Sequence, residues 1–156
     1  MEKINDRVYR DPLHNIVRID TRTRSGSLLA QLIDTREFQR LRRIRQLGLA
    51  YFAYQGAEHS RFTHSLGALH LATRTLDRLR AKYEISDDDH TAVRVAALLH
   101  DVGHGPFSHV IESILGFHHE RFSIEAIASE HTEIGAVLLS HSNGLADDVA
   151  AIIRGD

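Results

Sequence analysis

The sequence of 156 residues contains no cysteine. Without a thiol, the chain can form neither a disulfide nor a zinc site with thiolate ligands. A cysteine nucleophile is excluded for the same reason.

Long apolar runs are also lacking. None of the apolar stretches approaches the roughly 18 residues that a membrane-spanning helix needs. The amino-terminal residues MEKINDRVYR lack the apolar core of a secretory signal peptide. We therefore expect a cytoplasmic protein that has no membrane partner.

A charge excess of either sign is absent as well. Nineteen basic and 21 acidic side chains give a formal net charge of −2. Nucleic acid is therefore not favoured as a partner, although a local basic stripe leaves it open. With 42% hydrophobic residues, the composition is that of a globular protein, and we expect a single domain over residues 1–156.

Histidine, by contrast, is abundant. The 12 histidines outnumber the 10 glycines, and most of them lie between His59 and His119. Histidine is the commonest metal ligand in proteins and exchanges protons near neutral pH. Composition alone does not decide between a functional cluster of histidines and a scatter of imidazoles on the surface.

The hydrophobic pattern predicts an all-α fold. Residues 4–20, rich in Val, Ile and Tyr around a turn, predict a β-hairpin or extended arm, and residues 21–27 a polar loop. Helices are predicted at 28–33, from a cap at 34–37 to Gly48, at 63–81, from a cap at 87–89 through 92–99, and at 107–115, 120–129, 132–141 and 147–153. The segment 92–99 is apolar nearly all round, which indicates a central buried helix. These elements predict a compact helical bundle.

The residues best suited to chemistry begin where that buried helix ends. His100 and Asp101 form an imidazole and carboxylate pair, a donor set that suits Zn, Mn or Fe. An isolated pair of this kind is more often a hydrogen-bonded core histidine. Here, however, His104 and His109 follow, and Glu112 shares a helical face with His109. Further histidines open two more helices, in Arg61-Phe62-Thr63-His64 and in His118-His119-Glu120, which favours convergence on one site.

These residues resemble the HD-domain metal phosphohydrolases, in particular their deoxynucleoside triphosphate triphosphohydrolase branch. The resemblance rests on five ordered blocks, which are DPLHNIVRID (11–20), LIDTREFQRLRRIRQLG (32–48), GAEHSRFTHSLGALHLA (56–72), ALLHDVGHGPFSH (97–109) and HE (119–120). It implies the helical HD fold.

The resemblance also implies roles for individual residues. His64, His100 and Asp101 are expected to bind a divalent metal, which is Mn, Fe or Zn, with Mg also open. Arg61 is expected to contact substrate phosphate, and Gln46 the sugar. The phosphate-facing and acid–base residues are expected to be His104, His109, Glu112 and His119. The expected reaction converts a deoxynucleoside triphosphate to a deoxynucleoside and triphosphate, and a homo-oligomer is expected.

Other residues have weaker assignments. Asp34, Gln39 and Arg42 match positions where some relatives bind a regulatory nucleotide, but a helix cap with solvated charges is the favoured interpretation. His59 and His70 match no role and are interpreted as surface or supporting groups. The remaining histidines are expected to be structural or exposed; they are His14, His90, His118, His131 and His141.

One element of the family pattern has no counterpart. The family completes its metal site with a second Asp in a downstream motif, and Asp147, Asp148 and Asp156 are the only late candidates. We expect the 156 residues to be the amino-terminal part of a longer protein. Two alternatives stay open: a phosphodiesterase or single-strand nuclease, which a groove lined by Arg36, Arg40, Arg42, Arg43 and Arg45 would favour, and a non-catalytic nucleotide-sensing module.

Overall fold

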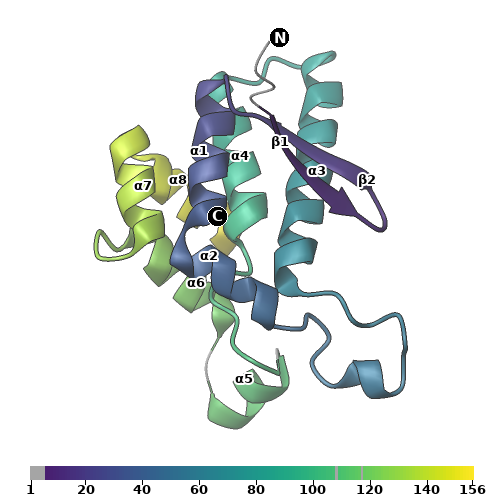
Figure 1. The fold of residues 1–156 in the computed structure, drawn as a ribbon. Helices are drawn as coiled ribbons and strands as arrows, with labels where there is room; N and C mark the ends of the chain where they lie inside the picture. The colour runs from purple at the N-terminus through teal and green to yellow at the C-terminus, as the bar shows by residue number, and fades with distance from the viewer. Residues whose placement is uncertain (1–5, 108, 117) are drawn as a thin grey trace.

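An antiparallel hairpin precedes a bundle of α-helices in the computed structural model, which describes residues 6–107, 109–116 and 118–156 (Figure 1). Strand β1 (Asp6–Asp11) pairs with β2 (Asn15–Asp20), and Asp6 lies opposite Asp20. The helices are α1 (Arg24–Asp34), α2 (Arg36–Gln39), α3 (Arg61–Arg80), α4 (Asp87–Leu99), α5 (His109–Leu115), α6 (His119–Ala128), α7 (Glu133–His141) and α8 (Leu145–Arg154). Two short 3-10 helices, Arg40–Arg43 and Ala50–Phe52, lie between α2 and α3 in the sequence. The predicted all-α class with an amino-terminal hairpin is confirmed.

Helix α4 is the centre of the bundle, as its apolar sequence predicts. It packs between α3 and α8, and the side chains of Val95, Leu98 and Leu99 have no exposed surface. Burial of one such leucine side chain contributes about 1.5–3 kcal/mol to folding. The rigid packing of α4 fixes the place where the chain leaves it, and this place is His100.

The hairpin covers one side of the bundle. Val17 and Ile19 alternate with polar residues along β2 and are both 2% exposed, and β2 packs against α1 and α3. Period-two alternation of this kind places one face of a strand on the core and the other in water. The hairpin therefore belongs to the same core as the helices.

The predicted helix boundaries near residues 21–48 are partly wrong. Residues 24–27 are helical rather than loop, because the Thr23 side chain accepts a hydrogen bond from the Gly26 N–H and starts α1 earlier. Asp34 does not cap the next helix. It is the last residue of α1, and its carboxylate pairs with Arg7 at 2.5 Å. Glu37 does not reach back as predicted, since it accepts instead from the Glu133 N–H at 3.3 Å.

The helix predicted to continue to Gly48 ends sooner. Helix α2 changes to a 3-10 helix at Arg40, and the backbone is extended at Ile44 because Ile44 and Arg45 pair with residues 60 and 61. The predicted cap at 87–89 lies one residue too late, since the Ser86 side chain caps α4 by accepting from the Asp89 N–H. Within the part of the chain that the structure describes, no helix is both long and apolar enough to cross a bilayer.

Candidate metal centre and its acid–base cluster

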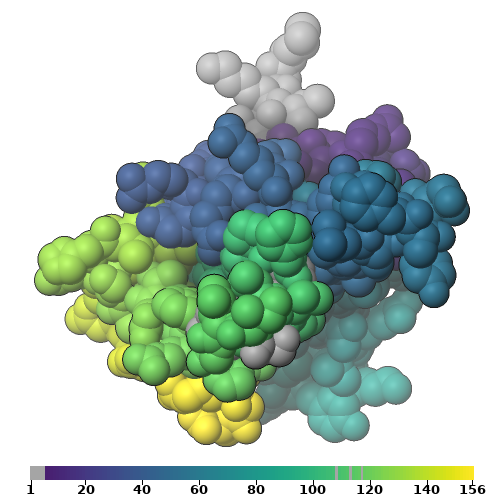
Figure 2. Space-filling model, turned by 90° about the horizontal axis from the view of Figure 1, so that it is seen from below, coloured from purple at the N-terminus to yellow at the C-terminus, as the bar shows by residue number. Residues whose placement is uncertain are grey.

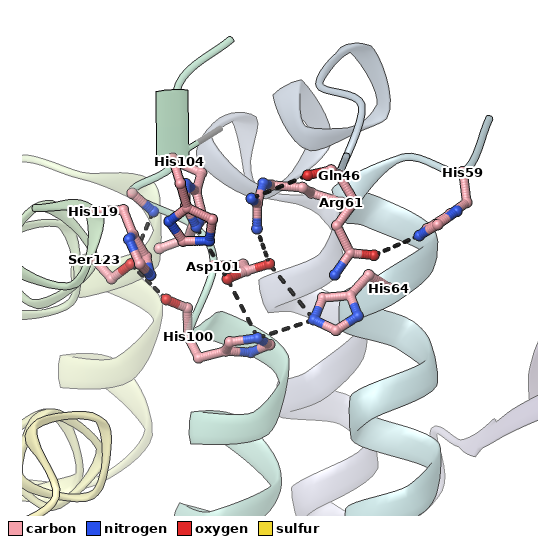
Figure 3. Close-up of polar contacts among 12 residues, drawn as sticks. Gln46, His59, Arg61, His64, His100, Asp101, His104, His119 and Ser123 are labelled. Carbon is pink, nitrogen blue, oxygen red and sulfur yellow. Dashed lines mark hydrogen bonds and ion pairs between the residues drawn. The ribbon is translucent and has the colours of Figure 1, made fainter. Parts of the chain in front are cut away.

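Three predicted metal ligands meet at the end of α4. His64 comes from the first turn of α3, whereas His100 and Asp101 follow α4 directly (Figure 3). The Nε2 atoms of His64 and His100 are 3.2 Å apart. The Asp101 carboxylate lies 3.6 Å from His64 Nε2 and 3.3 Å from His100 Nε2. One donor atom of each residue can therefore face a common point, as ligands of one ion must.

The protonation states of this triad suit a metal. The Nδ1 atom of His100 lies 3.0 Å from the carbonyl oxygen of Ala97, so a proton on Nδ1 leaves the Nε2 lone pair facing His64. A backbone partner of this kind is the usual support of a metal-binding histidine. Burial lowers the pKa of His64, which favours its neutral, ligating form. Two neutral imidazoles and one carboxylate fit a divalent transition metal.

Asp101 owes its charge to its neighbours. Burial alone would raise its pKa, but electrostatic interactions with the neighbouring His100 and Arg61 side chains, together with the hydrogen bond from Arg61, outweigh this effect and hold the pKa below its ordinary value. The Arg61 side chain is 3% exposed, and its Nη1 donates to Asp101 Oδ2 at 2.5 Å. Arg61 also donates from Nη2 to the backbone oxygen of Gln46 at 3.4 Å. The guanidinium thus lies beside the triad and connects it to the Gln46 segment.

A second cluster surrounds the Glu112 carboxylate. The Nδ1 atoms of three histidines face it: His104 at 2.8 Å, His119 at 3.1 Å and His109 at 3.3 Å. Burial would raise the pKa of Glu112, but hydrogen bonds from His119 and His109 lower it overall. The carboxylate is therefore ionised near neutral pH, and it forms hydrogen bonds with the imidazoles of His109 and His119.

His104 is the buried member of this cluster. Its side chain is 1% exposed, and its ring stacks on that of His119 with centroids 3.6 Å apart. Burial, with the charge of Arg61, lowers the pKa of His104 to about 3. The ring of His104 is therefore neutral at pH 7. His109, by contrast, has a 70% exposed side chain and is open to solvent.

The two clusters are parts of one site. His104 Nε2 lies 3.5 Å from Asp101 Oδ1, so a residue of the acid–base cluster is in direct contact with a residue of the triad. Figure 2 views the molecule from this end and shows α5, which carries His109 and Glu112, over the middle of the face. Of the 12 histidines, five gather in the two clusters, which are His64, His100, His104, His109 and His119.

Two supporting residues were not predicted from the sequence. Ser123 on α6 is fully buried, accepts from the Gly103 N–H at 2.9 Å and donates to the His100 carbonyl at 2.8 Å. Arg40 donates to the carbonyl oxygens of Val102 and His104. Both residues hold the turn between α4 and His104, and no local motif signals either role.

The candidate regulatory positions are occupied by contacts within the chain. Asp34 pairs with Arg7, and Gln39 donates to the Ile33 carbonyl at 2.7 Å. Arg42 bonds to Gln39 at 2.8 Å and lies over the Phe62 ring. These contacts agree with a structural use of the three residues.

The late aspartates do not join the triad. Asp148 lines a cavity with His90, at the opposite end of α4 from His100, and Asp156 bonds to Arg154 at 2.6 Å. Asp147 is exposed in the first turn of α8. Among residues 6–107, 109–116 and 118–156, the group at the end of α4 that could hold a metal ion therefore consists of two histidines and one carboxylate.

Comparisons with known proteins identify related sequences. The HD domain family matches residues 61–155. The chain is 44% identical to YwfO of Bacillus subtilis over 95% of its own length and 33% of that protein. It is 37% identical to the deoxynucleoside triphosphate triphosphohydrolase SAMHD1 of Gallus gallus, over 94% of this chain and 25% of that protein. The chain thus spans about a third or less of these relatives.

A solved structure has the same fold. A phosphohydrolase of Bacteroides thetaiotaomicron superposes with a TM-score of 0.78 at 34% identity, covering 96% of this chain and 34% of that chain. The match extends beyond residues 61–155 and so includes the hairpin and α1.

Proposed function

The chain belongs to the HD-domain family, and on this premise we propose that it is a metal-dependent phosphohydrolase that converts a deoxynucleoside triphosphate to a deoxynucleoside and inorganic triphosphate. The observation that carries the proposal is the 3.5 Å contact between His104 and Asp101, which joins a metal-binding triad to an acid–base cluster. Phosphoester hydrolysis needs both parts within reach of one phosphorus atom.

The metal would be held by His64, His100 and Asp101. We propose Mn, Fe or Zn for this site, with Mg as a further candidate, because the donors are mixed nitrogen and oxygen. When bound, such an ion polarises a phosphoryl oxygen and makes water a better nucleophile.

Arg61 supplies the fixed positive charge for the phosphates. Its contact with Asp101 holds the guanidinium at the edge of the triad. A planar guanidinium matches phosphate oxygens in a way that an ammonium does not. We propose that Arg61 binds a phosphate next to the metal triad, with neutral His104 as a hydrogen-bonding neighbour.

His109 is proposed to transfer the proton. Glu112 accepts the His109 Nδ1–H, which leaves Nε2 as the atom that gives a proton to the leaving oxygen or takes one from water. The exposure of His109 gives substrate access to it, while Glu112 holds His119 in the same way. A positioned acid or base of this kind contributes about 10²–10⁴-fold to the rate.

The choice of a nucleotide rests on Gln46 and on the relatives. The Gln46 amide lies beside His64, which is a member of the triad (Figure 3). From this position it can hold the sugar of a bound nucleotide. SAMHD1, which is named as a deoxynucleoside triphosphate triphosphohydrolase, is among the similar proteins. We also propose that the protein forms a homo-oligomer, since Val110, Ile114 and Leu115 are more than 60% exposed on α5.

A single-strand nuclease is less well supported. It would need a basic groove, yet Arg40 is bonded to backbone carbonyls and Arg42 lies over Phe62. Arg45 pairs with Glu58, and Arg36 lies 3.7 Å from Glu37. Most of these arginines are therefore committed within the chain rather than arranged along a groove.

The decisive experiment combines metal analysis with product identification. The purified chain is loaded with Mn, Fe, Zn or Mg at saturating concentration and offered deoxynucleoside triphosphates, ribonucleoside triphosphates and single-stranded DNA. We expect a deoxynucleoside and intact triphosphate from the first class, and a loss of about 10²-fold or more in His109→Gln. His131→Gln, at an exposed histidine between α6 and α7, is the matched control. Cleavage of DNA alone would favour the nuclease, and nucleotide binding without turnover would favour the sensing module.

A further inference from the structure

His59 lies outside both clusters but touches a residue of the proposed substrate site. Its Nε2 is 2.7 Å from Oε1 of Gln46, and the dashed line in Figure 3 marks this contact. Both residues are half-buried. The contact is among the shorter side-chain hydrogen bonds around the site, and we therefore ask what it does for Gln46.

The backbone fixes the two residues side by side. The Gln46 N–H donates to the His59 carbonyl at 3.1 Å, and the Arg61 N–H donates to the Ile44 carbonyl at 2.8 Å. Arg45 and Ser60 form the bridge between these two bonds. This short antiparallel pairing places the side chains of Gln46 and His59 as cross-strand neighbours, within reach of each other.

The hydrogen bond decides which end of the Gln46 amide faces the site. An amide has a carbonyl oxygen that accepts and an NH₂ group that donates, and the two ends exchange places when the group turns over. With the oxygen held by His59, the NH₂ group is directed toward His64, as Figure 3 shows. A turned amide would present an acceptor at the same point instead.

We propose that His59 is a positioning residue: its Nε2–H holds the Gln46 amide so that the NH₂ group donates to an oxygen of the substrate sugar. This inference rests on the proposed function, because it assigns the sugar contact of the same site. Among the described residues, His59 has its side-chain hydrogen bond to Gln46 rather than to the triad or the acid–base cluster, and we therefore expect it to act on substrate affinity rather than on the chemical step.

Two variants at position 59 distinguish the effect of the N–H donor from the effect of the ring. His59→Phe keeps the ring and removes the N–H, whereas His59→Gln keeps an N–H donor at a similar reach. We expect His59→Phe to raise KM for the nucleotide about tenfold, the effect of one neutral hydrogen bond, with kcat changed less than twofold. His59→Gln should restore most of the loss. In a Gln46→Ala background, His59→Phe should have no further effect, because the group it positions is gone. An equal loss in both backgrounds, or a fall in kcat alone, would overturn the proposal.

A second measurement does not depend on turnover. Nitrogen-15 NMR of the metal-free chain reports which ring nitrogen of His59 carries the proton when the ring is neutral. We expect the Nε2–H form in the wild type and a mixture of forms in Gln46→Ala. A wild-type ring protonated at Nδ1 alone would mean that the amide is turned and would overturn the inference. Absence of nucleotide turnover together with the Nε2–H form would refute the proposed function but support the positioning of Gln46.

Discussion

The Nε2 atoms of His64 and His100 lie 3.2 Å apart, although 36 positions separate the two residues in the sequence. Because the Nδ1–H of His100 is directed to the Ala97 carbonyl, its Nε2 offers a lone pair to His64. In the metal-free chain, one proton between the two rings satisfies both nitrogens. His64, His100 and Asp101 would together hold a divalent ion in place of this proton.

Metal binding should therefore depend sharply on Asp101. Asp101→Asn keeps the shape of the side chain but removes the anionic donor, so we expect metal affinity to fall by at least about a hundredfold. The helical signal in circular dichroism should persist. Asp148→Asn, at the other end of the bundle, should bind metal as the wild type does. Calorimetric titration with Mn or Zn makes the comparison, and an unchanged affinity in Asp101→Asn would place the metal elsewhere.

Substitution of Arg61 tests the phosphate contact. Arg61→Lys keeps the charge, but an ammonium cannot reach Asp101 and the Gln46 carbonyl with the same fork. We expect nucleotide affinity to fall about tenfold or more, measured by titration with a slowly hydrolysed analogue. Arg43→Lys, at an exposed position of the 3-10 helix, serves as the control. Equal affinities for all three proteins would remove Arg61 from the substrate site.

The triad supplies three ligands, whereas the resemblance implies four. We expect the 156 residues by themselves to bind divalent metal weakly and to turn over nucleotide slowly, because the described residues bring one carboxylate to the triad, where the family pattern has two. A groove of about 340 Å³ lies beside His100 and is lined in part by Ala96, Ala97 and Ile153. The measurement is metal content and turnover of this chain and of a longer form that includes downstream sequence. Equal values in both would contradict the prediction.

Acid should destabilise the fold well above the pH at which carboxylates titrate. Burial lowers the pKa of His104 from 6.5 to about 3, so the unfolded chain binds a proton there that the folded chain does not. The free energy of unfolding should therefore fall as the pH drops below 6.5, with a slope that approaches about 1.4 kcal/mol per pH unit for this one group.

Urea unfolding between pH 7 and pH 4.5, in the presence of a chelator, checks this slope. His104→Gln removes the titrating ring and should show a shallower dependence on pH than the wild type, whatever its stability at pH 7. His131→Gln should keep the wild-type slope. An unchanged slope in His104→Gln would mean that the ring is protonated in the folded state.

The close approach of α6 to the turn after α4 depends on Gly103. A Cβ atom at this position would lie 2.2 Å from the His119 carbonyl oxygen and 2.4 Å from the Ser123 nitrogen, both of which are backbone atoms. We expect Gly103→Ala to lower the free energy of unfolding by about 1–3 kcal/mol. Gly56→Ala, where nothing lies within 4 Å of the new atom, should be neutral or slightly stabilising. Thermal unfolding compares the two, and similar melting temperatures would contradict the packing described.

The features that could be predicted from the sequence are those set by local pattern. The apolar run at 92–99 predicts a buried helix, and the Val, Ile and Tyr residues around a turn in residues 4–20 predict the hairpin. The boundary at Asp34 could not be predicted, because its carboxylate pairs with Arg7, 27 positions away, instead of with the next helix.

The candidate site shows the same division. His64, His100 and Asp101 stand in a recognisable pattern, so their convergence could be expected before the structure. Ser123, Arg40 and His59 make contacts that depend on tertiary packing. These contacts form only when α6, the 3-10 helix at Arg40–Arg43 and the short antiparallel pairing of Arg45 with Ser60 pack around the site. No spacing along the chain encodes that packing.

Ser123 ties the metal-binding turn to a helix whose first residue is His119. Its hydroxyl accepts the Gly103 N–H, so this amide is shielded by α6 rather than by α4. Exchange of the Gly103 amide hydrogen with solvent then requires α6 to detach, not merely the end of α4 to fray. Each such opening also carries His119 away from Glu112. We therefore expect the turn after α4 and the acid–base cluster to open together, as one cooperative unit.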